Sequence, residues 1–205
     1  MANRRERPSR DAARTRALLL QEGFSEIYLR GFQSASIDRI LERVGATKGA
    51  FFHHFPRKVD LGYAVVDEVI RSMIEQQWVV PLKESRDPLT TIAESFDAGA
   101  RELERAPTNL GCPLNNLAQE MSPIDSGFRQ RTNAVFALWM GCFERAVRRG
   151  QQAGIVHADI SPGDVAFSLV SQIEGILSLS KNGDSRRALR TGSRTLRRYL
   201  ESLRG

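Results

Sequence analysis

Two cysteines and three histidines are the residues of this chain best suited to metal binding or nucleophilic catalysis. Cys112 and Cys142 lie thirty residues apart, which is the spacing of neither a disulfide framework nor a zinc site. His53, His54 and His157 form no ligand pattern with them. Cys112 with His157 as its base would be the pair for covalent catalysis, but the two are 45 residues apart and fit no known signature. We therefore expect no metal, no cofactor and no enzymatic activity.

A different chemistry is indicated by residues 47–58, TKGAFFHHFPRK. Thr47 is placed to cap a short helix, whose N-terminus offers unpaired N–H groups and the positive end of the helix dipole. Gly49 and Ala50 are small and let a DNA strand come close. Lys48 can reach a phosphate or a guanine edge, and the side chains placed to meet phosphates are His53, His54 and Lys58. The alternative is an ordinary solvated polar surface.

The charge distribution favours a polyanion-binding module at the N-terminal end. The net charge of the chain is +6. Residues 1–60 hold 12 Lys/Arg and 7 Asp/Glu, residues 61–185 hold 11 and 16, and residues 186–205 hold 7 and 1. The basic first sixty residues are typical of a surface that faces nucleic acid. The basic last twenty are equally well explained as a solvated surface.

Composition points to a soluble globular protein of the cytoplasm. The 205 residues are 41% hydrophobic and 26% charged, and no run of eighteen apolar residues is present. The basic N-terminus, MANRRERPSRDAARTR, is not followed by the apolar region of a signal peptide.

Helical spacing dominates the chain, and we predict an all-α fold of nine helices without strands. Three helices are expected in a DNA-binding domain at 1–57, the first from about Arg10 to Leu29 and the other two very short. Six are expected in a ligand-sensing and dimerisation domain at 58–205, beginning with a long helix from Lys58 to Val80 that Pro81 closes. The later helices are expected near 88–105, as a short helix that ends before Pro123, and near 125–154, 163–183 and 185–203.

The second and third predicted helices have the arrangement of a helix-turn-helix. Ser36 is expected to cap the first of this pair, which ends at Gly45, where glycine permits the sharp turn. Phe51 and Phe55, four residues apart, would anchor the following helix on a small core. The opposite face of that helix is left free for DNA.

The stretch TKGAFFHHFPRKVDL closely resembles the recognition-helix signature of TetR-type transcriptional regulators, S/T-K-G-x-x-Y-x-H-F-x-x-K-x-x-L. The matching residues are Thr47, Lys48, Gly49, His54, Phe55, Lys58 and Leu61. The specific motif covers about fifty residues, and the rest of the chain is similar only in helix order. The resemblance implies DNA-facing roles for Ser36, Thr47, Lys48, Gly49, His53, His54 and Lys58. Phe52 stands where the family has tyrosine, so one hydroxyl-to-phosphate hydrogen bond is expected to be missing.

An N-terminal arm and a dimer are further expectations. Arg4, Arg5, Arg7 and Arg10 could add contacts to the DNA backbone or minor groove, or be a solvated tail. The resemblance implies a homodimer. The helix near 164–180 is apolar over so much of its surface that it needs partners on more than one side, with small residues for close approach. The predicted interface residues are Val165, Leu169, Gln172, Ile173, Ile176, Leu189, Leu196, Tyr199 and Leu200.

The resemblance also implies that a small molecule binds the larger domain and changes the spacing of the two DNA-reading helices, with the long fourth helix carrying the movement. Aromatic and methionine side chains at helical spacing suggest an apolar or aromatic ligand, although such residues are often plain core. The predicted ligand-binding residues are Met73, Trp78, Phe96, Cys112, Asn116, Met121, Phe136, Trp139, Met140 and Phe143.

The stretch GCPLNNLAQEMS resembles an element, G-C-x-x-x-N-L-x-x-E, of one branch of the family. Cys112 near a helix N-terminus would favour a thiolate, so an electrophile or oxidant is a second possible effector. The main hypothesis is a ligand-released repressor of a pseudo-palindromic operator, with activation left open. The alternatives are a redox sensor acting through Cys112, a Cys/His enzyme, and an architectural DNA-binding protein without a ligand.

Overall fold

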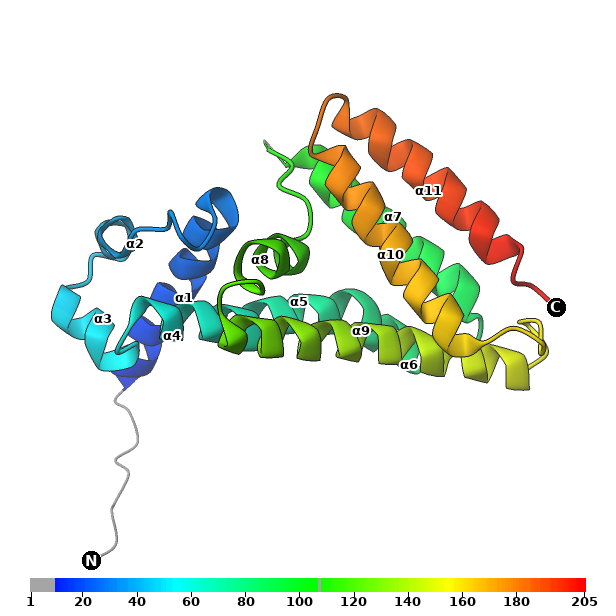
Figure 1. Cartoon of the computed structure of the whole chain (residues 1–205), viewed down its shortest axis with the longest axis horizontal. Coiled ribbons are helices and arrows are strands. Elements are labelled where there is room, and N and C mark those ends of the chain that lie inside the picture. The colour runs from blue at the N-terminus through cyan, green and yellow to red at the C-terminus, as the bar shows by residue number, and fades with distance from the viewer. Residues whose placement is uncertain (1–9, 107) are drawn as a thin grey trace, which may run out of the picture.

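A computed structural model describes residues 10–106 and 108–205 of the chain, and these are almost entirely helical. The predicted all-α fold of nine helices is confirmed for the described residues (Figure 1). No helix among them is long and apolar enough to cross a membrane. Of the predicted basic arm, Arg4, Arg5 and Arg7 lie outside the described residues, and Arg10 is the first residue of α1.

The first three helices form a compact unit, which we call the head (residues 10–57). They are α1 (Arg10–Arg30), α2 (Ile37–Val44) and α3 (Lys48–His54). α1 packs against both short helices, and Leu19, Ile40 and Phe51 are almost fully buried between them. Burial of these side chains is what allows two helices of eight and seven residues to be stable, because isolated helices of that length are not.

A buried glutamate that sequence analysis did not identify joins α1 to α2. The side chain of Glu26 is fully buried, and it accepts hydrogen bonds from Arg39 Nε at 2.7 Å, from the Arg43 guanidinium and from the Ser36 backbone N–H at 3.3 Å. Burial opposes ionisation of this carboxyl, but the bonds from Arg39 and Arg43 outweigh it and lower the pKa of Glu26. The head is thus held by an internal ion cluster as well as by its apolar core.

One long helical rod follows the head. It consists of α4 (Lys58–Ala64), η1 (Val65–Ile70), α5 (Arg71–Ile74), η2 (Glu75–Val79) and α6 (Val80–Lys83), where η1 and η2 are π-helical turns. The prediction that Pro81 closes the helix is wrong, since the helix continues to Lys83. The π-helical turn η2 ends two residues before Pro81, and such turns relieve the i→i−4 pattern with which a proline ring clashes.

Close packing joins the head to the rest of the molecule at Gly62. A Cβ atom added there would lie 2.5 Å from Phe128 Cζ and 2.6 Å from Phe32 Cε2, so only glycine fits. The Phe32 and Phe128 rings meet edge to face, with centroids 4.7 Å apart. Head, rod and α9 (Ser126–Gln152) therefore meet at one tightly packed point.

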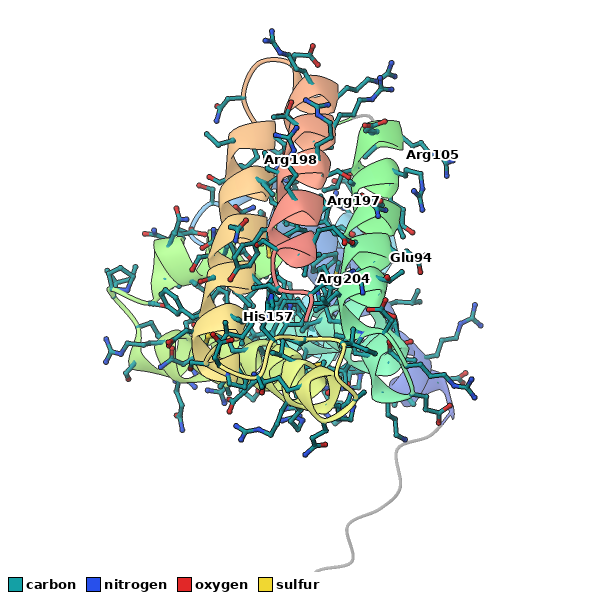
Figure 2. The ribbon with its side chains drawn as sticks, turned by 90° about the vertical axis from the view of Figure 1, so that its right-hand side faces the viewer. Glu94, Arg105, His157, Arg197, Arg198 and Arg204 are labelled. Carbon is teal, nitrogen blue, oxygen red and sulfur yellow. The ribbon has the colours of Figure 1, made fainter. Side chains whose placement is uncertain are left out.

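The remaining helices build the larger domain. α9 runs alongside the rod, and α8 (Pro113–Met121) lies between the head and the C-terminal helices (Figure 1). α7 (Pro88–Arg105), α10 (Pro162–Ser180) and α11 (Ser185–Glu201) stand side by side at the far end, with α11 between the other two (Figure 2). Arg197 of α11 pairs with Asp97 of α7, and Arg204 pairs with Asp87 at 3.0 Å. These pairs fix α11 against α7.

Candidate nucleic-acid interface and ligand cavity

The turn and caps of the helix-turn-helix are as predicted. Gly45 ends α2 with φ 70° and ψ 30°, the left-handed conformation that glycine adopts at least cost, and its N–H bonds Leu41 O at 2.9 Å. The Thr47 hydroxyl caps α3 by accepting from Ala50 N at 3.2 Å. Phe51 and Phe55 are 0% and 2% exposed and hold α3 on the head core.

The opposite face of α3 is open to solvent. Thr47, Lys48, Gly49 and His53 are exposed and Ala50 is half-buried, so the first turn of the helix is accessible to a partner. Lys48 Nζ lies 2.9 Å from Asp38 Oδ1, but both side chains are about 70% exposed and such a pair is worth only about 0.2–1 kcal/mol. A phosphate can therefore take Lys48 from Asp38 at little cost.

The two histidines are neighbours with different surroundings. Their ring centroids are 5.1 Å apart, His53 is exposed, and His54 is half-buried. Burial is the main cause that lowers the pKa of His54, with the charges of His53 and Arg16 adding to it. His54 is thus a neutral donor or acceptor at neutral pH rather than a cation.

Two of the predicted DNA-facing side chains already have hydrogen-bond partners in the head. The Lys58 ammonium donates to Gln33 O at 3.0 Å and lies 4.9 Å from the Phe32 ring centroid, and burial lowers its pKa. The Ser36 hydroxyl accepts from Arg39 N at 3.4 Å as the cap of α2. Lys58 is therefore not a free cation available to DNA, because its ammonium bonds the loop after α1 and joins the rod to it.

A cavity of about 590 Å³, which we call the core cavity, opens among the rod, α7, α8, α9 and α10. Its walls include five of the predicted ligand-binding residues, namely Met73, Trp78, Phe96, Cys112 and Trp139, together with Leu114 and Leu177. Trp78 and Trp139 stack with ring centroids 5.5 Å apart and an interplanar angle of 23°. This volume and aromatic lining are typical of a site for a small apolar molecule.

The other predicted pocket residues lie elsewhere. Asn116 faces a neighbouring cavity instead. Phe143 and Met121 are buried in the core, and Phe136 and Met140 pack against it from outside, so none of these four lines the core cavity. Helical spacing identified an apolar stripe of α9, but only one side of that stripe borders the cavity.

One buried polar group beside the core cavity, Trp139 Nε1, has no hydrogen-bond partner among the described residues. The carboxylate of Glu174, which follows cavity-lining Ile173 on α10, is also buried, and its hydrogen-bonding neighbours are the side chains of Cys112 and Asn115. Burial raises the pKa of Glu174 to about 7. Unpaired buried groups cost about 1–3 kcal/mol each and are unusual away from functional sites. The sequence offered no signal for Glu174 beyond its place in an apolar helix.

Cys112 does not have the environment expected of a reactive thiol. It is 7% exposed at the N-terminus of α8 and lies beside Glu174. Burial, followed by the charge of Glu174, raises the pKa of the Cys112 thiol well above its ordinary value. The expectation of a thiolate is therefore wrong, because desolvation outweighs the helix N-terminus. His157 is not among the residues that line the cavity, so the Cys/His pair is not assembled there either.

The predicted dimer residues are mostly inside the monomer. Val165, Leu169, Ile173, Leu189, Leu196 and Leu200 are each at most 4% exposed within the single chain, so they cannot form an interface with another copy. These residues belong to α10, which packs on α9 and α11, and to α11, which packs on α7. Gln172, Ile176 and Tyr199 are half-buried. Hydrophobicity identified the helices that pack most extensively but not which sides are already covered.

A different face of α10 is open. Phe167 is 66% exposed and Leu179 is 71% exposed. Ser171, Gly175 and Ser178 are exposed between them on the same side of the helix. This surface, which we call the α10 face, is apolar at both ends and small in the middle.

An exposed helix-turn-helix on a head and a ligand-sized cavity in a separate helical domain define a ligand-binding DNA regulator. Comparisons with known proteins agree with this class. The family profile described as bacterial regulatory proteins, tetR family, matches residues 15–65, and the one described as tetracyclin repressor-like, C-terminal domain, matches residues 88–196. The chain belongs to the TetR family of transcriptional regulators.

Individual relatives span most of the chain. The HTH-type transcriptional repressor DhaR of Mycobacterium sp. (strain GP1) is 25% identical over 166 residues, which cover 78% of each protein. The transcriptional regulator AcuR of Cereibacter sphaeroides is 27% identical over 180 residues, covering 86% of this chain and 81% of AcuR. A crystal structure of a TetR transcriptional regulator from Chloroflexus aurantiacus has a TM-score of 0.85 at 22% identity and covers 96% of this chain and 98% of that chain, which shows the shared fold.

Proposed function

We propose that this protein is a cytoplasmic transcriptional repressor that binds a pseudo-palindromic operator as a homodimer and is released by a small molecule in the core cavity. The observation that carries the proposal is α3, whose Phe51 and Phe55 are buried while Thr47, Lys48 and His53 face solvent. That arrangement presents a helix N-terminus and a cation to a major groove. We propose 1–57 as the DNA-binding unit and 58–205 as the sensing and dimerisation unit.

The effector is proposed to be an apolar or aromatic molecule that carries a hydrogen-bond acceptor. The stacked Trp78 and Trp139 rings favour an apolar body. The unpaired Trp139 N–H favours an acceptor close to it. With a protonated, buried Cys112, an oxidant or electrophile has less support than a reversibly bound ligand.

The test of DNA reading is a selection from random duplexes with the purified full-length protein at a stated near-physiological salt concentration. We expect recovery of a pseudo-palindrome whose two half-sites are separated, centre to centre, by one helical turn of DNA or a multiple of it. A bound ligand can hold the DNA-reading helices apart, so the selection is repeated with protein that was denatured and refolded. Recovery of no motif in both selections would overturn the proposal.

The α10 face is proposed as the centre of the dimer, because Ser171 and Gly175 let a second helix approach closely. Phe167→Glu is expected to weaken dimerisation about 100-fold, since each copy would bury an unpaired charge. Sedimentation velocity measures the change in mass, and operator affinity should fall with it. The matched control is Ile124→Glu, at a 64% exposed apolar residue outside this face. An unchanged dimer in Phe167→Glu would place the interface elsewhere.

A substitution at Phe52 tests the proposed orientation of α3 on DNA through a gain in affinity. Its ring is 46% exposed on α3. Phe52→Tyr adds a hydroxyl that can donate to a phosphate, and a hydrogen bond to a charged group contributes about 1.5–3 kcal/mol before competition with water. We expect operator affinity to rise about tenfold for the dimer, measured by fluorescence anisotropy. No change would mean that α3 meets the DNA at a different angle.

A further inference from the structure

The core cavity is not isolated from the head. A second cavity of about 480 Å³, which we call the head cavity, lies between α1 and α8. The two cavities share three lining residues, Tyr28, Ile70 and Pro113. The head cavity is bounded on the α1 side by Phe24 and Ile27. A molecule in the core cavity therefore lies one side chain away from a space that α1 of the head helps to line.

Tyr28 forms the partition between the two cavities. Its hydroxyl donates to Gly111 O at 2.5 Å, and its ring stacks on Phe24 with centroids 5.5 Å apart. Tyr28 belongs to α1 of the head, whereas Gly111 precedes α8 of the larger domain. Burial raises the pKa of Tyr28 to about 12, so the hydroxyl remains a donor at neutral pH. A ligand that occupies both cavities must displace Tyr28 and break a direct link between the head and the sensing domain.

The head cavity carries a cation without an anionic partner. Lys181 Nζ donates to the amide oxygen of Asn116 at 2.9 Å, and no carboxylate of the described residues lies within ion-pair distance of it. The Lys181 side chain runs along Gly111, where an added Cβ would meet Lys181 Cδ at 2.7 Å. The ammonium is thus held at the cavity wall by a neutral group that a carboxylate would displace readily.

The acidic residue of the head cavity, Glu120, bonds the backbone of the head and not Lys181. Glu120 Oε2 accepts from Phe32 N and Glu120 Oε1 accepts from Gln33 N, both at 2.8 Å. This carboxylate therefore does not neutralise Lys181, and it fixes α8 to the loop that follows α1. An anion can therefore bind Lys181 without breaking the hydrogen bonds between Glu120 and the head.

We propose that the head cavity binds the carboxylate end of an elongated effector, whose mainly apolar tail lies in the core cavity and carries there the acceptor for Trp139 Nε1. Lys181 pairs with the carboxylate, and the chain of the ligand takes the place of Tyr28 between the cavities. The effector then binds more tightly to the state in which the Tyr28–Gly111 hydrogen bond is broken. A ligand can shift the position of the head only if its affinity differs between two such states. This inference rests on the proposed function, because it assigns the chemical class of the effector and its route to the head.

The test uses isothermal titration calorimetry of the full-length protein with hexanoate, octanoate, decanoate and dodecanoate, and with decan-1-ol as the uncharged match for decanoate. We expect affinity to rise with length from hexanoate to decanoate as the tail reaches the core cavity. Lys181→Met is expected to weaken decanoate binding about fivefold and to leave decan-1-ol within twofold, since a partly exposed ion pair is lost. The control Lys83→Met removes an exposed lysine of α6 and should change neither.

Tyr28→Phe provides the second variant. It keeps the ring but removes the bond to Gly111, so decanoate should bind about threefold to fivefold more tightly while hexanoate binding stays the same.

Equal losses of affinity for decanoate and decan-1-ol in Lys181→Met, or no carboxylate binding at all, would overturn the inference. These titrations contain no DNA, so they stand whether or not an operator is found. If a ligand releases the protein from its operator and its affinity is unchanged by Lys181→Met and by Tyr28→Phe, the proposed function stands and only this inference fails.

Discussion

Replacing Lys48 with glutamate is expected to weaken operator binding at least 100-fold while leaving the fold unchanged. Lys48 is the first residue of α3, its side chain is 68% exposed, and its only ion pair in the described chain is with the equally exposed Asp38. The substitution removes one phosphate contact per protomer and turns an anion toward the DNA backbone. The loss counts twice in a dimer, so operator affinity should fall by several kcal/mol.

Fluorescence anisotropy over a range of salt concentrations separates this effect from general damage. Each lost phosphate contact lowers the slope of log affinity against log salt by about 0.9, so the dimer should lose about 2. The matched control is Lys83→Glu, the same charge change at an exposed lysine of α6, at the opposite end of the rod from the head. If both variants bound the operator equally well, the reading of α3 as the recognition helix would fail.

The local features of the head could be predicted because each rests on residues close in sequence. Ser36 and Thr47 cap the two short helices and Gly45 ends the first of them, and these roles follow from side-chain and backbone chemistry within three or four residues. The burial of Phe51 and Phe55 follows from their spacing of one helical turn. Such predictions need no knowledge of what the helices pack against.

Long-range partners could not be predicted in the same way. The sequence shows that Leu169 and Phe167 are both apolar residues of one helix, but not that the first is buried within the chain and the second is exposed. It shows Lys58 as a cation, but not that its ammonium is bonded to a carbonyl 25 residues away. Tyr28 and Gly111, which are 83 residues apart, gave no pairwise signal.

Gly23 illustrates the same limit within a single helix. Glycine in a helix interior costs about 1 kcal/mol relative to alanine, so from sequence it is a weakness of α1. In the folded chain a Cβ there would lie 2.9 Å from both terminal carbons of Leu61, which packs into the head from the rod. The loss of helix stability at Gly23 is offset by close packing between α1 and α4, and the sequence alone does not show that these two helices meet.

Replacing the buried Glu26 with glutamine is expected to destabilise the head. Its carboxylate is fully buried and is bonded by Arg39 and Arg43, whose side chains are about 40% exposed. Glu26→Gln keeps the size of the side chain but removes the charge, which leaves Arg39 without its anion and Arg43 with Glu22 alone. Breaking a buried pair costs about 3–5 kcal/mol, and since the arginines reach solvent we expect a loss of about 3 kcal/mol in the free energy of unfolding at pH 7.

The pH dependence gives the second part of this prediction. The pKa of Glu26 is lower in the folded chain than in the unfolded chain, so its stabilising contribution is present above the ordinary glutamate pKa. That contribution is lost as the pH falls through the lowered folded-state pKa. The difference between the wild type and Glu26→Gln should therefore be full at pH 7 and shrink below a pH of about 4.

Urea denaturation followed by circular dichroism at several pH values measures both effects. The matched control is Glu22→Gln, because Glu22 also lies within 3.3 Å of Arg43 but is 32% exposed. Its loss should stay within about 1 kcal/mol, as for other exposed pairs. Equal losses in the two variants would mean that the ion cluster is no more than a surface pair, and that the apolar core around Phe51 holds α1 and α2 together without it.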